Sequence, residues 1–263
     1  MSDLDPTRRE GTIATILLNR PERMNAISLA MWQALADALK AVNDAATLRC
    51  LGIPGAAAPD GRVAFGAGAD IAEFLERRSS AAQAESYAAI MEQASEALRD
   101  SPHPTVALVQ GACVGGGLEI ALQCDLRIAG AGARFGIPIA RIGNALPTSA
   151  LRALVELCGR STALELLLEG RIYGAEEALR TGLVTRVLPD AEVEAEALAA
   201  AQRIAAGAPL VHRYHKAFTR RAADPRPFSR EEWAAPYALC DSADYAEGVR
   251  AFLAKRPPKF EGR

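Results

Sequence analysis

The chain has 263 residues, of which half are hydrophobic, and a formal net charge of −2. This length fits one large domain, or one domain with an appendage, and it provides enough apolar residues for a sizeable core. The nearly balanced charge gives no overall field for nucleic acid or an anionic membrane, so we expect neither as a partner.

The cysteines and the start of the chain indicate its compartment. Five cysteines are scattered without a CxxC pair, which is typical of reduced thiols in an apolar core. The first eleven residues, MSDLDPTRREG, contain no apolar signal core. No stretch approaches the roughly 20 apolar residues that are needed to span a bilayer. We therefore expect a cytoplasmic protein.

Strand and helix signals alternate in the first hundred residues. Residues 12–19, TIATILLN, are β-branched and apolar and predict a strand. Ser28 is a good N-cap for an amphipathic helix that extends to about residue 46. A short strand is expected near residues 48–53, and a second helix over about residues 81–99.

The second half continues this alternation and then changes. Pro104 opens a strand, TVALVQG, which leads into a glycine cluster, a short helix and another strand. Alternation up to about residue 190 is typical of an α/β architecture with crossover connections. From Ala191 onward the pattern is nearly all helical. We predict a core over residues 1–190 and a C-terminal helical oligomerisation region over residues 191–263.

Two glycine-rich segments each join a strand to a short helix: residues 65–71 (FGAGADI) and residues 111–119 (GACVGGGLE). Glycine permits positive φ and lets a ligand approach the backbone, and the free N–H groups at a helix start attract negative charge. One such cluster alone is more typical of a tight turn with close strand–helix packing. Two clusters of the same kind indicate a binding site.

Three chemistries use glycines in this way. A phosphate-binding P-loop is excluded because no lysine follows Gly117. Gly111, Gly115 and Gly117 match the GxxxGxG spacing of short-chain dehydrogenases, but no tyrosine here has a lysine four residues later, which leaves a nicotinamide oxidoreductase as a weak alternative. The third is an oxyanion hole, in which two backbone N–H groups stabilise a thioester oxygen as the α-carbon becomes enolate-like.

Five segments in order resemble the enoyl-CoA hydratase/isomerase (crotonase) superfamily over nearly the whole chain. They are LNRPERMNAIS (18–28), FGAGADI (65–71), GACVGGGLEIALQCDLRIA (111–129), AEEALRTGLVTRVLP (175–189) and EGVRAFLAKRPPKFEGR (247–263). The resemblance implies an α/β spiral of ββα turns, with C-terminal helices that form a homotrimer or a dimer of trimers. It also implies an acyl-CoA thioester substrate and no separate cofactor, because coenzyme A is part of the substrate.

The resemblance also implies the site residues. Its oxyanion donors correspond to the N–H groups of Ala69 and Gly116, and its first catalytic glutamate corresponds to Glu119. The substrate-binding residues that it implies are Arg23, Met24 and Ala26 at the CoA arm, Ala69, Asp70, Ile71, Ala72 and Gly116 along the thioester and pantetheine, Ile139 opposite Glu119, and Phe252 and Lys255 toward the nucleotide, from this or a neighbouring subunit. Phe252 and Lys255 are equally typical of a buried aromatic and a solvated lysine.

One position departs from the family pattern. Hydratases of this family place a second glutamate directly after an FGxP turn, and here residues 135–138 are followed by Ile139. Isoleucine can neither transfer a proton nor orient water, which puts hydration by paired carboxylates in doubt. Reversible hydration of 2-enoyl-CoA with Glu119 as the sole acid/base is the first hypothesis. An isomerase, an epimerase, a C–C lyase and a non-catalytic acyl-CoA binder stay open.

The remaining polar candidates carry weaker signals. Arg141 and Asn144 lie just beyond the FGxP turn and could bind substrate, although loop roles are the commoner interpretation. Asp125 begins a strand and is expected to be structural. The histidines of the helical region, at positions 212 and 215, lack a third ligand, so we expect no metal site.

Overall fold

The structure, a computed structural model, describes residues 3–263, without the side chains of residues 6 and 7. Its strands form a six-stranded sheet in the order β1-β2-β3-β4-β6-β9 and a three-stranded sheet in the order β5-β7-β8. The strands of the larger sheet are β1 (Leu4–Glu10), β2 (Ile13–Leu18), β3 (Cys50–Pro54), β4 (Thr105–Val109), β6 (Leu126–Gly130) and β9 (Arg186–Leu188). The smaller sheet consists of β5 (Ala112–Val114), β7 (Arg134–Gly136) and β8 (Ile172–Gly174).

Crossover helices connect the parallel strands. Only β1 pairs antiparallel within the larger sheet, and parallel neighbours need a long connection. The helices of the body are α1 (Leu29–Asn43), α2 (Phe74–Arg77), α3 (Ala81–Arg99), α4 (Gly116–Gln123), α5 (Thr148–Leu168), α6 (Ala175–Arg180) and α7 (Val193–Ala205). Helix α1 connects β2 to β3, and α3 precedes β4. The predicted α/β architecture with crossovers is confirmed.

Local sequence patterns predict several of these elements. The side chain of Ser28 accepts a hydrogen bond from the N–H of Met31 at 3.2 Å and caps α1, as predicted. The helix predicted over residues 81–99 is α3. Strand β1 lies in a polar segment that carries no strand signal in the sequence. It pairs with β2 at the edge of the sheet, where exposed polar side chains are tolerated.

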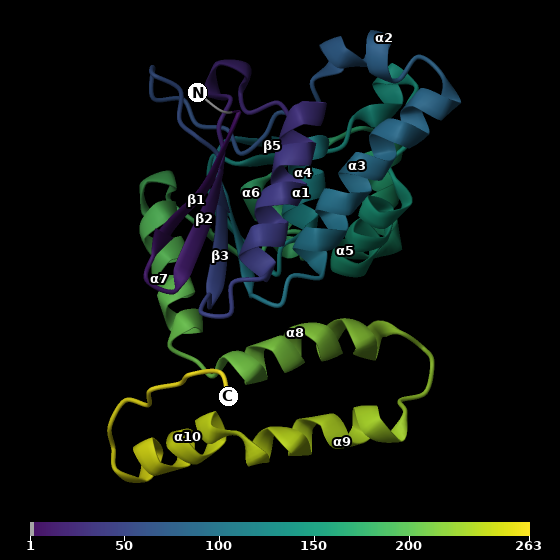
Figure 1. Cartoon of the computed structure of the whole chain (residues 1–263). Helices are drawn as coiled ribbons and strands as arrows, with labels where there is room; N and C mark the ends of the chain where they lie inside the picture. Colours follow the sequence, from purple (N-terminus) through teal and green to yellow (C-terminus); the bar gives the residue numbers. More distant parts are fainter. Residues whose placement is uncertain (1–2) are drawn as a thin grey trace.

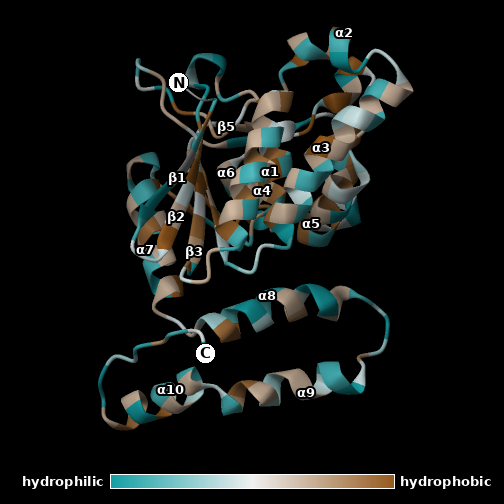
Figure 2. Ribbon diagram, in the orientation of Figure 1, coloured by the Kyte–Doolittle hydropathy of each residue, from teal (hydrophilic) through white to brown (hydrophobic). Residues whose placement is uncertain are grey.

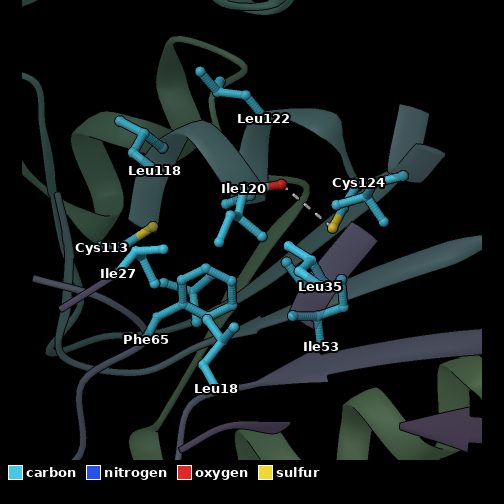
Figure 3. Close-up of a cluster of buried hydrophobic side chains, with 14 of the residues drawn as sticks. Leu18, Ile27, Leu35, Ile53, Phe65, Cys113, Leu118, Ile120, Leu122 and Cys124 are labelled. Atoms are coloured by element: carbon cyan, nitrogen blue, oxygen red, sulfur yellow. Dashed lines mark hydrogen bonds between the residues drawn. The ribbon is translucent and has the colours of Figure 1, made fainter. Parts of the chain in front are cut away.

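The larger sheet is covered on both faces (Figure 1). On one face Cys50, Val106 and Ile128 pack against buried side chains of α7. On the other face the sheet packs against α1, α3 and α4 in the main core. Figure 3 shows the centre of this core, where Leu35 of α1 and Ile120 of α4 lie near strand residues. All residues of α4 are buried, so this packing fixes the helix that carries Glu119.

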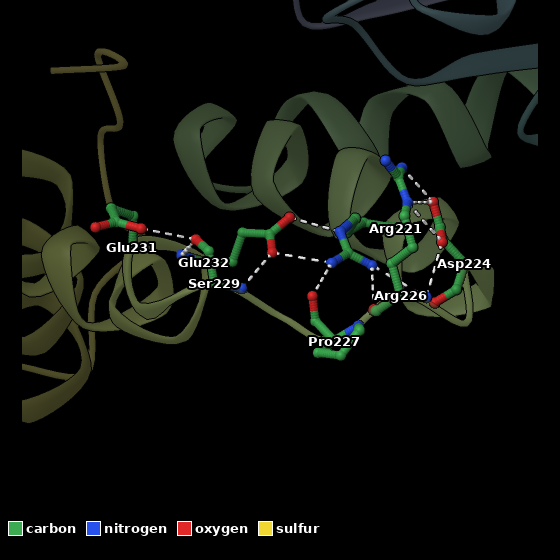
Figure 4. Close-up of polar contacts among 7 residues, drawn as sticks. All are labelled: Arg221, Asp224, Arg226, Pro227, Ser229, Glu231 and Glu232. Carbon is green, nitrogen blue, oxygen red and sulfur yellow. Dashed lines mark hydrogen bonds and ion pairs between the residues drawn. The ribbon is translucent and has the colours of Figure 1, made fainter.

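An arm of three helices follows the body: α8 (Pro209–Ala223), α9 (Arg230–Ala238) and α10 (Ala243–Leu253). Lys216 ties the arm to the body, because its Nζ lies 2.7 Å from a carboxylate oxygen of Asp125 and donates to the carbonyl of His103 at 3.0 Å. The turn between α8 and α9 is held by Arg221, which pairs with Glu232 at 2.5 Å (Figure 4). Asp125 therefore links strand β6 and arm structurally.

The arm exposes several large apolar side chains. Trp233, Tyr237 and Phe252 are 67%, 74% and 83% exposed. Figure 2 shows apolar and polar residues mixed along the arm, whereas the labelled strands β2 and β3 are mainly apolar. Helix α7 packs on the core sheet and the arm begins after it, while the domain boundary at residue 190 stays a prediction. No helix within residues 3–263 is both long and apolar enough to cross a membrane.

Candidate active site

Asn25 fixes the turn between β2 and α1. It is fully buried and adopts a positive φ of 53°, which asparagine tolerates better than most residues. Its Oδ1 accepts from the N–H of Arg20 at 2.8 Å, and its Nδ2 donates to the carbonyls of Ala56 and Ala64 at 3.0 and 2.6 Å. The chain on either side of this side chain is therefore held in one conformation.

The first glycine-rich segment packs along that turn. The N–H of Ile27 donates to the carbonyl of Gly68 at 2.8 Å, and the N–H of Asp70 donates to the carbonyl of Ile27 at 2.9 Å. The N–H of Ala69, between them, has no acceptor among the described residues. The Asp70 carboxylate lies 3.0 Å from the guanidinium of Arg20, so this side chain ties the segment to the turn.

The second glycine-rich segment presents the start of α4. Gly115 has a φ of 48°, and α4 begins at Gly116. The first N–H groups of a helix have no hydrogen-bond partner inside it. The N–H of Gly116 also has no acceptor elsewhere in residues 3–263. A Cβ at Gly116 would lie 3.5 Å from the backbone nitrogen of Ala69. Two donors without acceptors therefore lie on adjacent stretches of backbone.

Both donor residues line one cavity of about 290 Å³. The cavity brings together five of the predicted site residues: Ala69, Ile71, Gly116, Glu119 and Ile139. Much of the remaining wall is apolar and includes Phe74, Met91, Val114, Ile137, Pro138, Ile142 and Pro147. Hydrogen bonds to a developing negative charge are stronger in such a low-dielectric setting than in water.

Glu119 is the carboxyl group of this cavity. It lies in the first turn of α4 and is only 6% exposed. Burial raises its pKa from 4.5 to about 7, while the positive charge of Arg78 opposes the increase and the negative charge of Glu92 adds to it. No hydrogen bond to its carboxyl group occurs within the described residues. A carboxyl group that titrates near neutral pH can both accept and return a proton.

Ile139 lines the same cavity as Glu119 and begins the 3₁₀ turn Ile139–Ile142. The preceding residues Phe135 and Ile137 are fully buried, so the core fixes where this turn starts. The departure seen in the sequence is therefore in the cavity wall, and Glu119 is the single carboxyl group in that wall within the described chain.

The other predicted substrate residues lie outside this cavity. Arg23 and Met24 are exposed on the turn that Asn25 holds, and Ala26 is half-buried there. Asp70 and Ala72 flank the cavity-lining Ile71 without lining the cavity themselves. These residues surround the segment that carries Ala69, and their contact with a CoA arm stays a prediction.

Phe252 and Lys255 lie at the C-terminal end of the arm. Phe252 is 83% exposed, so the interpretation as a buried aromatic does not hold within this chain. Figure 1 shows α10 at the end of the molecule away from α2, which begins with the cavity residue Phe74 and is followed directly by the cavity residue Arg78. Their contact with the nucleotide part of CoA, from this or another subunit, stays a prediction.

Three further polar residues line the cavity. Arg141 and Asn144 are the weaker substrate-binding candidates from the sequence, whereas Arg78 belongs to an ordinary charged stretch to which the sequence assigns no role. Asn25 lies inside the family motif of residues 18–28, but the sequence does not predict its hydrogen bonds to the carbonyls of Ala56 and Ala64. No group of three or more potential metal ligands occurs within the described part of the chain.

Comparison with known proteins identifies the family. Residues 8–263 match the family model of enoyl-CoA hydratase/isomerase. The chain is 34% identical over 256 residues to the crotonyl-CoA hydratase of Syntrophomonas wolfei, covering 96% of this chain and 95% of that protein. The chain therefore belongs to the enoyl-CoA hydratase/isomerase, or crotonase, family and is an enzyme of that family.

Solved structures give the same fold. An enoyl-CoA hydratase/carnithine racemase from Magnetospirillum magneticum superposes with a TM-score of 0.94 at 44% identity, covering 98% of this chain and 96% of that one. DspI from Pseudomonas aeruginosa superposes with a TM-score of 0.89 at 33% identity, covering 99% and 97%. The predicted crotonase fold is confirmed.

Proposed function

We propose that this enzyme catalyses the reversible hydration of 2-enoyl-CoA thioesters. The observation that carries the proposal is the position of two backbone N–H groups without acceptors, at Ala69 and Gly116, beside the buried carboxyl group of Glu119 in one apolar cavity. Family membership supports an acyl-CoA substrate. The similarity to a crotonyl-CoA hydratase supports a 2-enoyl acyl group.

The proposed reaction needs one carboxyl group for its proton balance. The thioester oxygen accepts hydrogen bonds from the N–H groups of Ala69 and Gly116. The ionised Glu119 takes a proton from water while the water oxygen bonds to C3 of the acyl chain, and the double-bond electrons move toward the thioester as an enolate. Protonated Glu119 then gives a proton to C2, so that one water is added and the carboxylate is restored.

Proton transfer at the α-carbon without hydration is the second candidate, and Ile139 favours it. A second carboxylate would help to orient water, whereas an isoleucine in the cavity wall cannot. Isomerisation, epimerisation or C–C cleavage needs the same enolate and can proceed with Glu119 alone. The similar structure from Magnetospirillum magneticum, described as a hydratase/carnithine racemase, is consistent with either reaction.

The test is an assay of crotonyl-CoA with purified enzyme, following the loss of the conjugated enoyl absorbance. We expect Glu119→Gln to lower kcat by about 10²–10⁴-fold, because the amide cannot exchange a proton with water or with C2. Glu85→Gln, which changes an exposed glutamate on α3, serves as the matched control and should keep full activity. Binding of enoyl-CoA esters without hydration at any chain length would reject the hydratase proposal and leave the second candidate.

A further inference from the structure

Arg78 is a cation held at the cavity by aromatic rings. It follows α2 directly and lines the cavity. Its guanidinium carbon lies 4.4 Å from the ring centre of Phe74 and 5.2 Å from that of Tyr87. Contacts of this kind orient an arginine through the faces of its planar group and leave the N–H edge available for other partners.

That N–H edge has few partners within the protein. Its one hydrogen bond in the described chain is long, at 3.4 Å, to the side-chain oxygen of Asn144. No carboxylate lies within ion-pair distance of Arg78 in residues 3–263, whereas Arg20 and Arg221 each have one within 3.0 Å. A guanidinium has five N–H donors in a fork that matches the two oxygens of a carboxylate. Most of these donors are free to meet a ligand.

The charge of the cavity wall points to an anionic ligand. Two arginines, Arg78 and Arg141, line the cavity against one glutamate, Glu119. A carboxylate at position 139 would balance the positive charge of one arginine, but Ile139 carries no charge. The apolar side chains between these groups reduce solvent screening, so a negative charge on the ligand would gain more here than at an open surface.

We infer that Arg78 binds a carboxylate on the acyl group of the substrate, and that the preferred substrates are CoA thioesters of dicarboxylic acids. The inference rests on the proposed acyl-CoA function. The thioester oxygen would lie at Ala69 and Gly116, and the distal carboxylate would meet the free edge of the guanidinium. Arg141, which is more exposed on the same wall, adds attraction for the same charge.

The test compares two saturated esters with equal numbers of acyl carbons, glutaryl-CoA and pentanoyl-CoA, by calorimetric titration of the wild-type enzyme. Neither ester has a double bond to hydrate, so the titration reports binding alone. We expect glutaryl-CoA to bind more tightly. Arg78→Met should weaken glutaryl-CoA binding by about tenfold or more, as expected for loss of hydrogen bonds to a charged group. The affinity of the Arg78→Met variant for pentanoyl-CoA should stay close to that of the wild type.

Two further variants serve as a control for the position of the arginine and as a test of its fork geometry. Arg77→Met removes a neighbouring exposed arginine that does not line the cavity and should leave both affinities unchanged. Arg78→Lys keeps the charge but loses the fork and should be intermediate. Tighter wild-type binding of pentanoyl-CoA would overturn the inference without any variant. So would an equal loss for both esters in Arg78→Met, which is the result expected from a packing role. If the wild type binds neither ester, the proposed acyl-CoA function fails as well.

Discussion

At the scale of single residues, the chemistry depends on how Glu119 is buried. Burial favours the protonated carboxyl group, and Arg78 favours the ionised one, with a pKa of about 7 as the result. In the unfolded chain this group has its ordinary pKa of 4.5. The folded protein therefore holds a proton between these two pH values that the unfolded chain has already lost. The free energy of unfolding should decrease as the pH rises through this range.

The same titration predicts the pH dependence of activity. In the proposed hydration an ionised Glu119 accepts a proton from water, so we expect kcat/KM to rise with pH and level off above about 7. A pH–rate profile with crotonyl-CoA measures this. A profile that is flat through neutral pH would mean that Glu119 is not the base.

Some residues of the site can be recognised from the sequence, and others cannot. Ala69, Gly116 and Glu119 lie in segments where glycines and a family motif mark them, and Ile139 is visible as a departure from that motif. Arg78 carries no such mark, because its position depends on the rings of Phe74 and Tyr87, which come from different helices. Contacts of this kind become known only once the chain is folded.

At the scale of elements, the start of α4 depends on close backbone packing. A Cβ on Gly117 would overlap the carbonyl of Gly66, so the two glycine-rich segments need a glycine here to touch. We expect Gly117→Ala to lower the free energy of unfolding by about 1–3 kcal/mol, as overpacking in a tight core does. Denaturant unfolding measures this.

Gly174→Ala is the matched control for that change. Gly174 has a φ of −76°, and a Cβ there would meet nothing within 4 Å, so its effect on stability should be small. Equal stability of the two variants would contradict the packing proposed for Gly117. The sequence shows that both segments are glycine-rich, but not that Gly66 and Gly117 meet.

At the scale of the whole molecule, crossovers assemble the cavity from distant segments. Ala69 precedes α2, Glu119 lies on α4, and Ile139 follows β7, yet all three line one space. The alternation of strands and helices predicts the α/β class, because it follows from local patterns. Strand β1 forms a hairpin with the adjacent β2, but its polar residues carry no strand pattern of their own. The docking of the arm through Lys216 and Asp125 depends on a contact between residues far apart in the sequence, which local patterns do not contain. Assembly of the arm into a trimer stays a prediction.

We propose that Glu119 forms a thioester enolate, which the N–H groups of Ala69 and Gly116 stabilise. The most direct test of this claim is hydrogen exchange at C2 of butyryl-CoA in D₂O, measured by mass spectrometry. Butyryl-CoA has no double bond to hydrate, so exchange reports the enolate alone. We predict that the wild-type enzyme exchanges the C2 hydrogens, and that Glu119→Gln binds butyryl-CoA without exchange. Wild-type enzyme that binds butyryl-CoA but exchanges no C2 hydrogen would contradict the claim.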